Sequence, residues 1–378
     1  MKTSSRLYII IYIAIIITSF ASCENEIPYN PGTQEPQLIM NALLDAGATE
    51  NYVYLHMNRG YNLEQLKEAT LTLSVNDRTE TLEAISPEEY YKDVIGRFDK
   101  EAFKHIVENM RFTPFRLTAS FHPGDRIRLE ANAENGKYHA SAEVIVPHPV
   151  EHLHVDTCTV YLRKYHKQTP YRQYKITLQD RPDEKNYYRL DIRNENSYRF
   201  LWKENKGEEN EATRDTIVSG YESCEIINRE DVILTDGHPT GYDDEGNELF
   251  PTITNKYNIF NDSMFRNSHA TLRVYTPLNF PGYPTYTWNH YYEEIYYTQT
   301  ITIRLLTLTE AEYRYLKALN CLKDDNYDES LMEPVCLPSN VNGGLGFVGI
   351  CSETNVILKI PEQRIFNIYT EEEYPYNT

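Results

Sequence analysis

Three glycines near the end of the chain have the spacing of a cofactor-binding loop. Gly344, Gly346 and Gly349, in the segment GLGFVG, match G-x-G-x-x-G, the dinucleotide fingerprint. That loop needs a strand before it and a helix after it, because the helix N-terminus binds the pyrophosphate. Here prolines precede the segment, and the residues that follow are β-branched and stop at Pro361. The context predicts a glycine-rich strand or bulge, where absent side chains let two backbones approach closely.

Two further polar segments have residue types that bind metals. His152 and His154 would share one face of a strand, and a His-x-His pair can ligate zinc or copper. No third ligand is evident, so we interpret them as surface histidines near a domain boundary. The acidic segment 236–248 has carboxylates that suit calcium, but its spacing differs from D-x-D-x-D-G. We therefore expect a solvated turn and predict neither a metal nor a cofactor.

An aromatic segment, 281–292, is the candidate ligand contact. If it is extended, one face would carry Tyr286, Trp288, His290 and Tyr292. Such a stripe suits sugars, peptides or a protein interface, and ordinary core packing is the alternative. The sequence has no H-E-x-x-H, G-x-S-x-G, S-x-x-K or P-loop motif, so we assign no catalytic residue and expect a protein that is not an enzyme.

The N-terminus has the pattern of an export signal. Lys2 and Arg6 precede the apolar run Leu7–Ile17, which is shorter than the roughly 20 residues that span a bilayer. The run ends in SFASC, which resembles a bacterial lipobox, where cleavage precedes Cys23 and the thiol is lipidated. The alternative is an ordinary signal peptide with a chance cysteine. The acidic residues after Cys23 resemble the signal that directs Bacteroidota lipoproteins to the cell surface.

Composition limits the remaining classes. The chain has 378 residues, of which 25% are charged and 40% hydrophobic, as in globular proteins. A net charge of −19 repels phosphate backbones, so we expect no nucleic-acid partner. No C-x-x-C occurs, which argues against a zinc cluster. One disulfide among the last three cysteines is open; otherwise we expect small buried groups at Cys158, Cys224, Cys321, Cys336 and Cys351.

The elements that must position these residues are mostly strands. Period-two alternation predicts strands throughout 37–75 and 115–146, with a hairpin turn at Glu134–Lys137. Ser86, with Pro87 after it, predicts a helix start, and Thr309 opens a T-x-x-E capping box. A third helix, capped by Asp99, would present Phe103, Ile106, Val107 and Met110 on one face.

Strands also dominate the second half of the predicted chain. Candidates are 155–161, 171–178, 187–193, 271–275, 295–308 and 355–360, whereas the polar segments 203–219 and 236–248 are expected to be long loops. The predicted organisation is a signal peptide at 1–22, a tether at 23–36, and an immunoglobulin-like β-sandwich at 37–149 with a helical insertion near 86–111. A larger antiparallel β domain, sandwich or barrel-like, with one helix follows at 150–378.

Several motifs together resemble a known family. They are the strand PQLIMNALL from Pro36, the strand from Tyr138 to Pro147, the segment FNDSMFRN from Phe260, and the closing run from Glu333 through Gly349. Over roughly 23–361 the chain is similar to a Bacteroidota outer-membrane lipoprotein family known as domain of unknown function 4249.

Members of that family are often found beside TonB-dependent receptors. The resemblance therefore implies a membrane-anchored accessory of nutrient uptake, with such a receptor as partner, an unknown nutrient as ligand, and no catalytic residues. The leading hypothesis is a surface-exposed outer-membrane lipoprotein that binds a ligand or partner without catalysing a reaction. Alternatives are a hydrolase of surface glycans or peptides, and a structural or adhesive envelope protein.

Overall fold

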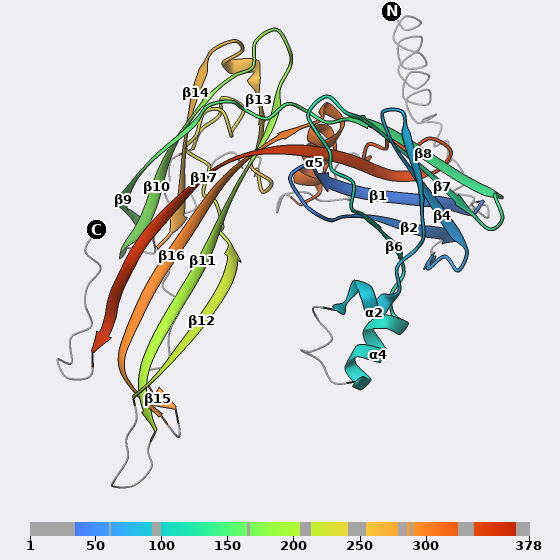
Figure 1. Ribbon diagram of the computed structural model, residues 1–378. Helices are drawn as coiled ribbons and strands as arrows, with labels where there is room; N and C mark the ends of the chain where they lie inside the picture. Colours follow the sequence, from blue (N-terminus) through green and yellow to red (C-terminus); the bar gives the residue numbers. More distant parts are fainter. Residues whose placement is uncertain are drawn as a thin grey trace, which may run out of the picture.

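The fold was examined in a computed structural model. It describes residues 35–59, 62–92, 100–164, 167–204, 213–240, 255–278, 286–287, 290–323 and 336–367. The protein is mainly β, as predicted, with several antiparallel sheets that pack as two sandwiches side by side (Figure 1). Cys23, its apolar leader and most of the predicted tether lie outside the described residues.

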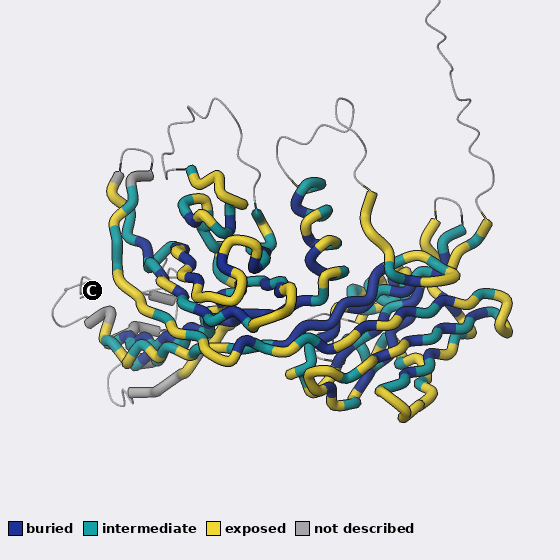
Figure 2. Tube along the Cα trace, turned by 90° about the horizontal axis from the view of Figure 1, so that it is seen from above, coloured by how far each residue is buried: buried dark blue, intermediate teal, exposed yellow. Residues whose placement is uncertain are grey.

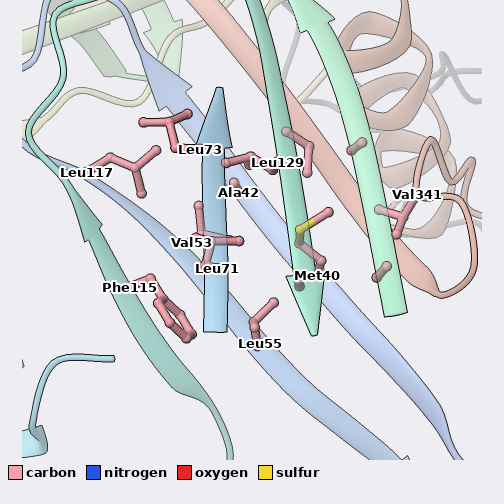
Figure 3. Packing of buried hydrophobic residues seen from close by; sticks show 14 of the residues in the cluster. Met40, Ala42, Val53, Leu55, Leu71, Leu73, Phe115, Leu117, Leu129 and Val341 are labelled. Carbon is pink, nitrogen blue, oxygen red and sulfur yellow. The ribbon is translucent and has the colours of Figure 1, made fainter. Parts of the chain in front are cut away.

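The first sandwich packs two sheets around one apolar core. One sheet contains β1 (Gln37–Asp45), β2 (Asn51–Arg59), β3 (Asn62–Glu64) and β6 (Thr113–Leu117). The other has the order β5 (Arg78–Leu82), β4 (Ala69–Val75), β7 (Arg126–Ala133), β8 (Tyr138–Ile145). Alternate residues of the strands point inward, so the core gathers side chains from both sheets (Figure 3). Among them are Met40, Ala42, Val53, Leu55, Leu71, Leu73, Phe115 and Leu129.

The second sandwich has longer strands. Its smaller sheet has the order β14 (His269–Pro277), β10 (Lys167–Gln179), β9 (Leu153–Lys164). The larger contains β12 (Thr213–Ser223), β11 (Tyr187–Glu204), β16 (His290–Leu308) and β17 (Leu345–Asn367), with the short strands β13 (Ile259–Asn261) and β15 (Tyr286–Thr287) at its ends. Buried residues of β10, β11, β14 and β16 form its core.

Strand β17 belongs to both sandwiches. Its first residues pair in parallel with β1, from Ile39 opposite Leu345 to Asp45 opposite Cys351. From Cys351 onward it pairs antiparallel with β16 instead. The larger sheets of the two sandwiches are therefore one ten-stranded sheet, and Cys351 marks where β17 passes from one to the other. The division of the chain at residue 150 stays a prediction, but residues of β17 complete the first core.

The glycines of GLGFVG lie at the start of β17, as the strand interpretation predicted. Gly346 has φ +110°, and a Cβ there would collide with the carbonyl oxygen of Met40 on β1. A Cβ on Gly344 would likewise collide with the carbonyl oxygen of Leu38. The backbones of β1 and β17 can approach this closely only because the side chains are absent.

The three predicted helices are present. Helix α2 (Pro87–Tyr90) begins after Ser86, whose hydroxyl accepts the Glu89 N–H, and Pro87 is its first residue. Helix α4 (Lys100–Glu108) follows, and its predicted cap, Asp99, lies outside the described residues. Helix α5 (Glu310–Leu322) begins after Thr309, whose hydroxyl accepts the Glu312 N–H. A short 3-10 helix, η1 (Asp262–Met264), follows β13. Figure 2 shows α5 standing in the middle of the molecule, between the two sandwiches.

Two predictions about the second half are wrong. The segment 203–219 was expected to be a loop, but its last residues open the edge strand β12, which pairs with β11 over its whole length. Strand β17 does not stop at Pro361 either. Ile360 pairs with Gln299 and Gln363 with Tyr297, so Pro361 lies in a bulge, where its missing N–H interrupts no ladder hydrogen bond.

Candidate ligand-binding pocket beside helix α5

A tightly folded loop forms one wall of the candidate site. Buried Asp231 fixes it: one carboxylate oxygen accepts the N–H groups of Ile233 and Leu234, each at 2.9 Å. The other oxygen accepts the N–H of Arg273 on β14 at 2.6 Å. Burial raises the pKa of Asp231, although these N–H groups oppose the shift. One carboxylate thus holds residues 229–240 against the smaller sheet of the second sandwich.

Two amide side chains fix α5 opposite that loop. Asn255 donates to the carbonyl oxygens of Leu234 at 2.9 Å and Ile259 at 2.7 Å. Its amide oxygen accepts a hydrogen bond from Asn320 of α5 at 3.0 Å, and Asn320 in turn accepts the N–H of Tyr257 at 3.2 Å. Because Asn320 is 5% exposed, losing this network would leave buried polar groups without partners. The network sets the separation of loop and helix.

The space between them is a pocket of about 680 Å³, which we call the α5 pocket. Its volume lies in the range of small-molecule sites. The loop contributes Leu234, Thr235, Asp236, Gly237, His238, Pro239 and Thr240; Asn255 and Ile259 form part of the base; and α5 contributes Tyr313, Lys317, Asn320 and Cys321. Apolar surface therefore lies beside polar groups that are fixed from behind, an arrangement that suits reversible binding.

Charged groups stand in the wall of the α5 pocket. The Lys317 ammonium lies 3.2 Å from the Asp236 carboxylate and 5.8 Å from the centre of the Tyr313 ring. Burial alone would lower the pKa of Lys317, but Tyr313 and Asp236 raise it, so Lys317 stays protonated. Within the described part of the chain, the buried hydroxyl of Thr240 has no hydrogen-bond partner. A ligand with polar groups would find an anion and a cation in one space.

Beneath α5, an ionic cluster joins the two sandwiches. Arg304 of β16 contacts Asp45 of β1 at 3.1 Å and Asp191 of β11 at 3.1 Å. Its Nε also donates to Glu353 of β17 at 2.8 Å. Burial opposes the charge of Arg304, but Glu353 and Asp191 raise the pKa of the guanidinium above its ordinary value. The Arg304 cluster therefore holds three carboxylates together where β17 changes partners.

Glu312 is the most unusual titratable group of α5. Glu312 is 4% exposed, and its Oε2 has no hydrogen-bond partner among the described residues. The carboxylate lies so close to Gly349 of β17 that a Cβ there would be 2.7 Å from Oε2. Burial raises the pKa of Glu312 to about 7; the charge of Arg189 opposes the shift and that of Asp45 adds to it. Glu312 lies at the seam of α5 and β17 and does not line the α5 pocket.

Of the four residues predicted as ligand contacts, the structure describes only the backbone of Tyr286, His290 and Tyr292. Thr287 of β15 pairs with His290 of β16, so the chain reverses between them. Tyr286 and Tyr292 therefore do not follow one another along a single extended strand, as the one-face stripe required. Trp288 and the side chains of Tyr286, His290 and Tyr292 lie outside the described residues. Their role in binding stays a prediction.

The other predicted polar residues are at the surface. His152 and His154 are exposed, and His154 lies 3.3 Å from Asp156. Asp236 of the acidic segment pairs with Lys317, residues 237–240 line the α5 pocket, and residues 241–248 lie outside the described residues. Across the described ranges, no three His, Cys, Asp or Glu side chains form a group that could hold a metal. The five cysteines after Cys23 are free thiols. Cys351 is buried, but Cys158 and Cys336 are exposed, so the expectation of small buried groups is wrong for these two.

Sequence reasoning missed most of the α5 pocket. Asp231 and Asn255 lie outside every predicted element and motif, and Lys317 lies on the predicted helix after Thr309, where its sequence position gave it no role. The one available signal was Asn320, an amide on the otherwise apolar side of the predicted helix. A buried amide needs partners, and here those partners build the pocket.

The geometry defines a class: a mainly β protein of two joined sandwiches with a ligand-sized pocket beside the helix at their junction. Among its described residues, no helix has both the length and the apolar character to cross a bilayer. The family described as "Domain of unknown function (DUF4249)" matches residues 24–356, and the chain belongs to that family. None of the curated proteins matches the chain.

Proposed function

We propose that this protein is an outer-membrane lipoprotein, anchored through Cys23 and facing the cell exterior, that binds a small nutrient in the α5 pocket and serves a TonB-dependent transporter. The observation that carries the binding role is the α5 pocket itself. Its walls are fixed by buried Asp231 and the Asn255–Asn320 pair, so little order must be gained when a ligand enters. The anchor and the transporter partner rest on the lipobox-like leader and the family resemblance.

Binding fits the α5 pocket better than hydrolysis does. A hydrolase needs an acid pair or an activated nucleophile that reaches the substrate. Glu312, with its raised pKa, resembles a general acid, but it packs against Gly349 behind the helix. The carboxylate that does line the pocket, Asp236, is paired with Lys317. These groups favour recognition of a ligand with polar groups of both charges.

The anchor and the transporter partner are tested in cells. Cys23→Ser should abolish incorporation of a labelled fatty acid into the protein and release it from the outer membrane. Separate deletions of the genes for this protein and for its transporter should give the same growth defect on the same nutrient. Lipid labelling that persists in Cys23→Ser would contradict the anchor, and unrelated growth defects would contradict the transport role.

The α5 pocket is tested by filling it. Lys317→Trp places a large ring at an exposed helix position that lines the pocket, so the fold should survive while the binding space shrinks. Lys104→Trp makes the same exchange at an exposed position of α4, away from the pocket. The first variant should fail to restore growth to the deletion strain, and the second should restore it.

A further inference from the structure

A second groove lies on the other side of α5, over the outer face of the first sandwich. Residues of β1, β2 and β17 that point away from the core form its floor, because side chains alternate between the two faces of a sheet. Asn41 of β1 pairs with Phe347 on one side and with Tyr54 on the other, which sets these residues in one row across the sheet. The side chain of Leu43, farther along β1, is largely exposed.

Aromatic rings wall this groove on both sides. Tyr315 of α5 stacks on Phe347, with ring centres 4.4 Å apart and planes inclined by 7°. On the opposite side Tyr52 and Tyr54 of β2 lie with ring centres 6.4 Å apart. Tyr90 of α2 contacts Tyr52 edge-on at 5.5 Å. Because both walls are supported by neighbouring rings, the half-exposed faces of Tyr52 and Tyr315 are held in place.

The aromatic groove has a volume of about 570 Å³. It is lined by Asn41, Ala42, Leu43, Asp45, Ala48, Glu50, Asn51, Tyr52, Tyr54, Tyr315 and Phe347. These lining residues, all within the described ranges, include two acids and no lysine, arginine or histidine. An anionic ligand would therefore find no cationic side chain in the lining of the groove.

The two acids of the groove differ in what neutralises them. Asp45 is held by Arg304 at 3.1 Å. Glu50 accepts a hydrogen bond from the hydroxyl of Tyr52 at 3.1 Å. Burial raises the pKa of Tyr52, and this hydrogen bond raises it further. Arg116 pairs across the sheet with Tyr52 and acts on the charge of Glu50, but it also forms an ion pair with Glu89, so one cation serves two acids. The excess charge at the rim is therefore negative and lies beside a ring face.

We propose that the aromatic groove binds a positively charged side chain, arginine or lysine, of a protein partner. Ring faces attract cations through their quadrupole, and Arg also stacks on them. Glu50 supplies the opposite charge at the rim, and the overall charge of −19 attracts basic partners from a distance. This inference concerns a second site and does not depend on the occupant of the α5 pocket.

The test uses the purified chain and two synthetic peptides in calorimetric titrations at low salt. The probe is acetyl-Gly-Arg-Gly-Arg-Gly-amide, and its control has citrulline, a neutral isostere, in place of each arginine. The arginine peptide should bind about tenfold more tightly than the citrulline peptide. Its affinity should fall as salt is added, because the contribution of Glu50 is screened.

Three variants locate the binding. Glu50→Gln should remove most of the difference in affinity between the two peptides. Tyr52→Leu should weaken the binding of the arginine peptide several-fold. Glu83→Gln removes one acid from an exposed position outside the groove and should change nothing.

Four results would overturn the proposal. The first two are equal affinity for both peptides and no binding of the arginine peptide at millimolar concentration. The third is unchanged selectivity in Glu50→Gln. The fourth is tighter binding of a neutral trisaccharide, such as cellotriose, that competes with the peptide.

Discussion

The α5 pocket and the aromatic groove share one helix but are built differently. The pocket is held by buried amide and carboxylate hydrogen bonds, and its charges, Lys317 and Asp236, face each other. The groove is held by ring stacking, and its rim acid, Glu50, accepts a hydrogen bond from Tyr52 and shares the charge of Arg116 with Glu89. One side of α5 thus suits a ligand with groups of both charges, and the other suits a cation. A single helix at the junction can serve two partners.

Both sites include residues of α5, which packs on the continuous sheet where the Arg304 cluster lies. The largest expected effect is therefore that of Arg304→Met. It would leave Asp45, Asp191 and Glu353 close together without their shared cation, so we expect a loss of about 3–5 kcal/mol of unfolding free energy. Urea unfolding would measure this loss.

The matched control for that variant is Arg193→Met. Arg193 also contacts Asp191, at 2.8 Å, but its side chain is 54% exposed. An exposed pair contributes at most about 1 kcal/mol. Equal losses for the two variants would show that the Arg304 cluster is not the element that joins the sandwiches.

The second effect is that of pH on the seam under α5. The pKa of Glu312 is raised from 4.5 to about 7 in the folded chain, so the unfolded chain loses this proton first as pH rises. The burial of Glu312 therefore lowers the unfolding free energy increasingly as pH rises from 4.5 to about 7, and the loss is complete above that pH. Glu312→Gln removes the penalty: it should be close to neutral at pH 4.5 and stabilising by about 3 kcal/mol at pH 8.

Thermal or urea unfolding of both chains across pH 4.5–8 would measure this difference. Glu310→Gln, an exchange at an exposed residue of the same helix turn, should show no such pH dependence. If the Glu312→Gln difference did not grow with pH, the pKa of Glu312 would not be raised in the folded chain.

The third effect separates the two sites. Asn320→Ala would leave the amide oxygen of Asn255 and the N–H of Tyr257 without their partner, at a cost of about 2 kcal/mol. The loss should fall on the α5 pocket alone, so the affinity of the arginine peptide should stay within about twofold of wild type. A large loss of peptide affinity would mean that the two sites are not independent.

The smallest effect on stability is expected in the groove. Glu50→Gln changes an exposed carboxylate and should alter the unfolding free energy by less than about 0.5 kcal/mol. It should nevertheless remove most of the selectivity for arginine over citrulline. A stability change above 1 kcal/mol would indicate a structural role for Glu50 instead.

Local patterns in the sequence predicted most of the fold. Strand patterns located most strands of both sandwiches, with β5 and β12 among the exceptions, and Ser86 and Thr309 marked two helix starts correctly. The glycine spacing of GLGFVG also indicated a close backbone approach before its partner, β1, was known. Each of these signals lies within a few residues of the element it predicts.

The features that define the sites come from contacts distant in sequence. The T-x-x-E box predicted a helix start, but only the packing of Gly349 against α5 buries Glu312. Arg304 alternates like any polar strand residue, and its partners come from three other strands. Pro361 reads as a strand end because the bulge that accommodates it depends on β16. The polarity of 203–219 likewise concealed the edge strand β12.

The most direct test of the central claim, that the α5 pocket holds the ligand, is growth of the deletion strain that carries either Lys317→Trp or Lys104→Trp at equal surface levels. We predict that Lys317→Trp reproduces the defect of the transporter deletion on the same nutrient and that Lys104→Trp restores wild-type growth. Full restoration of growth by Lys317→Trp would contradict the account.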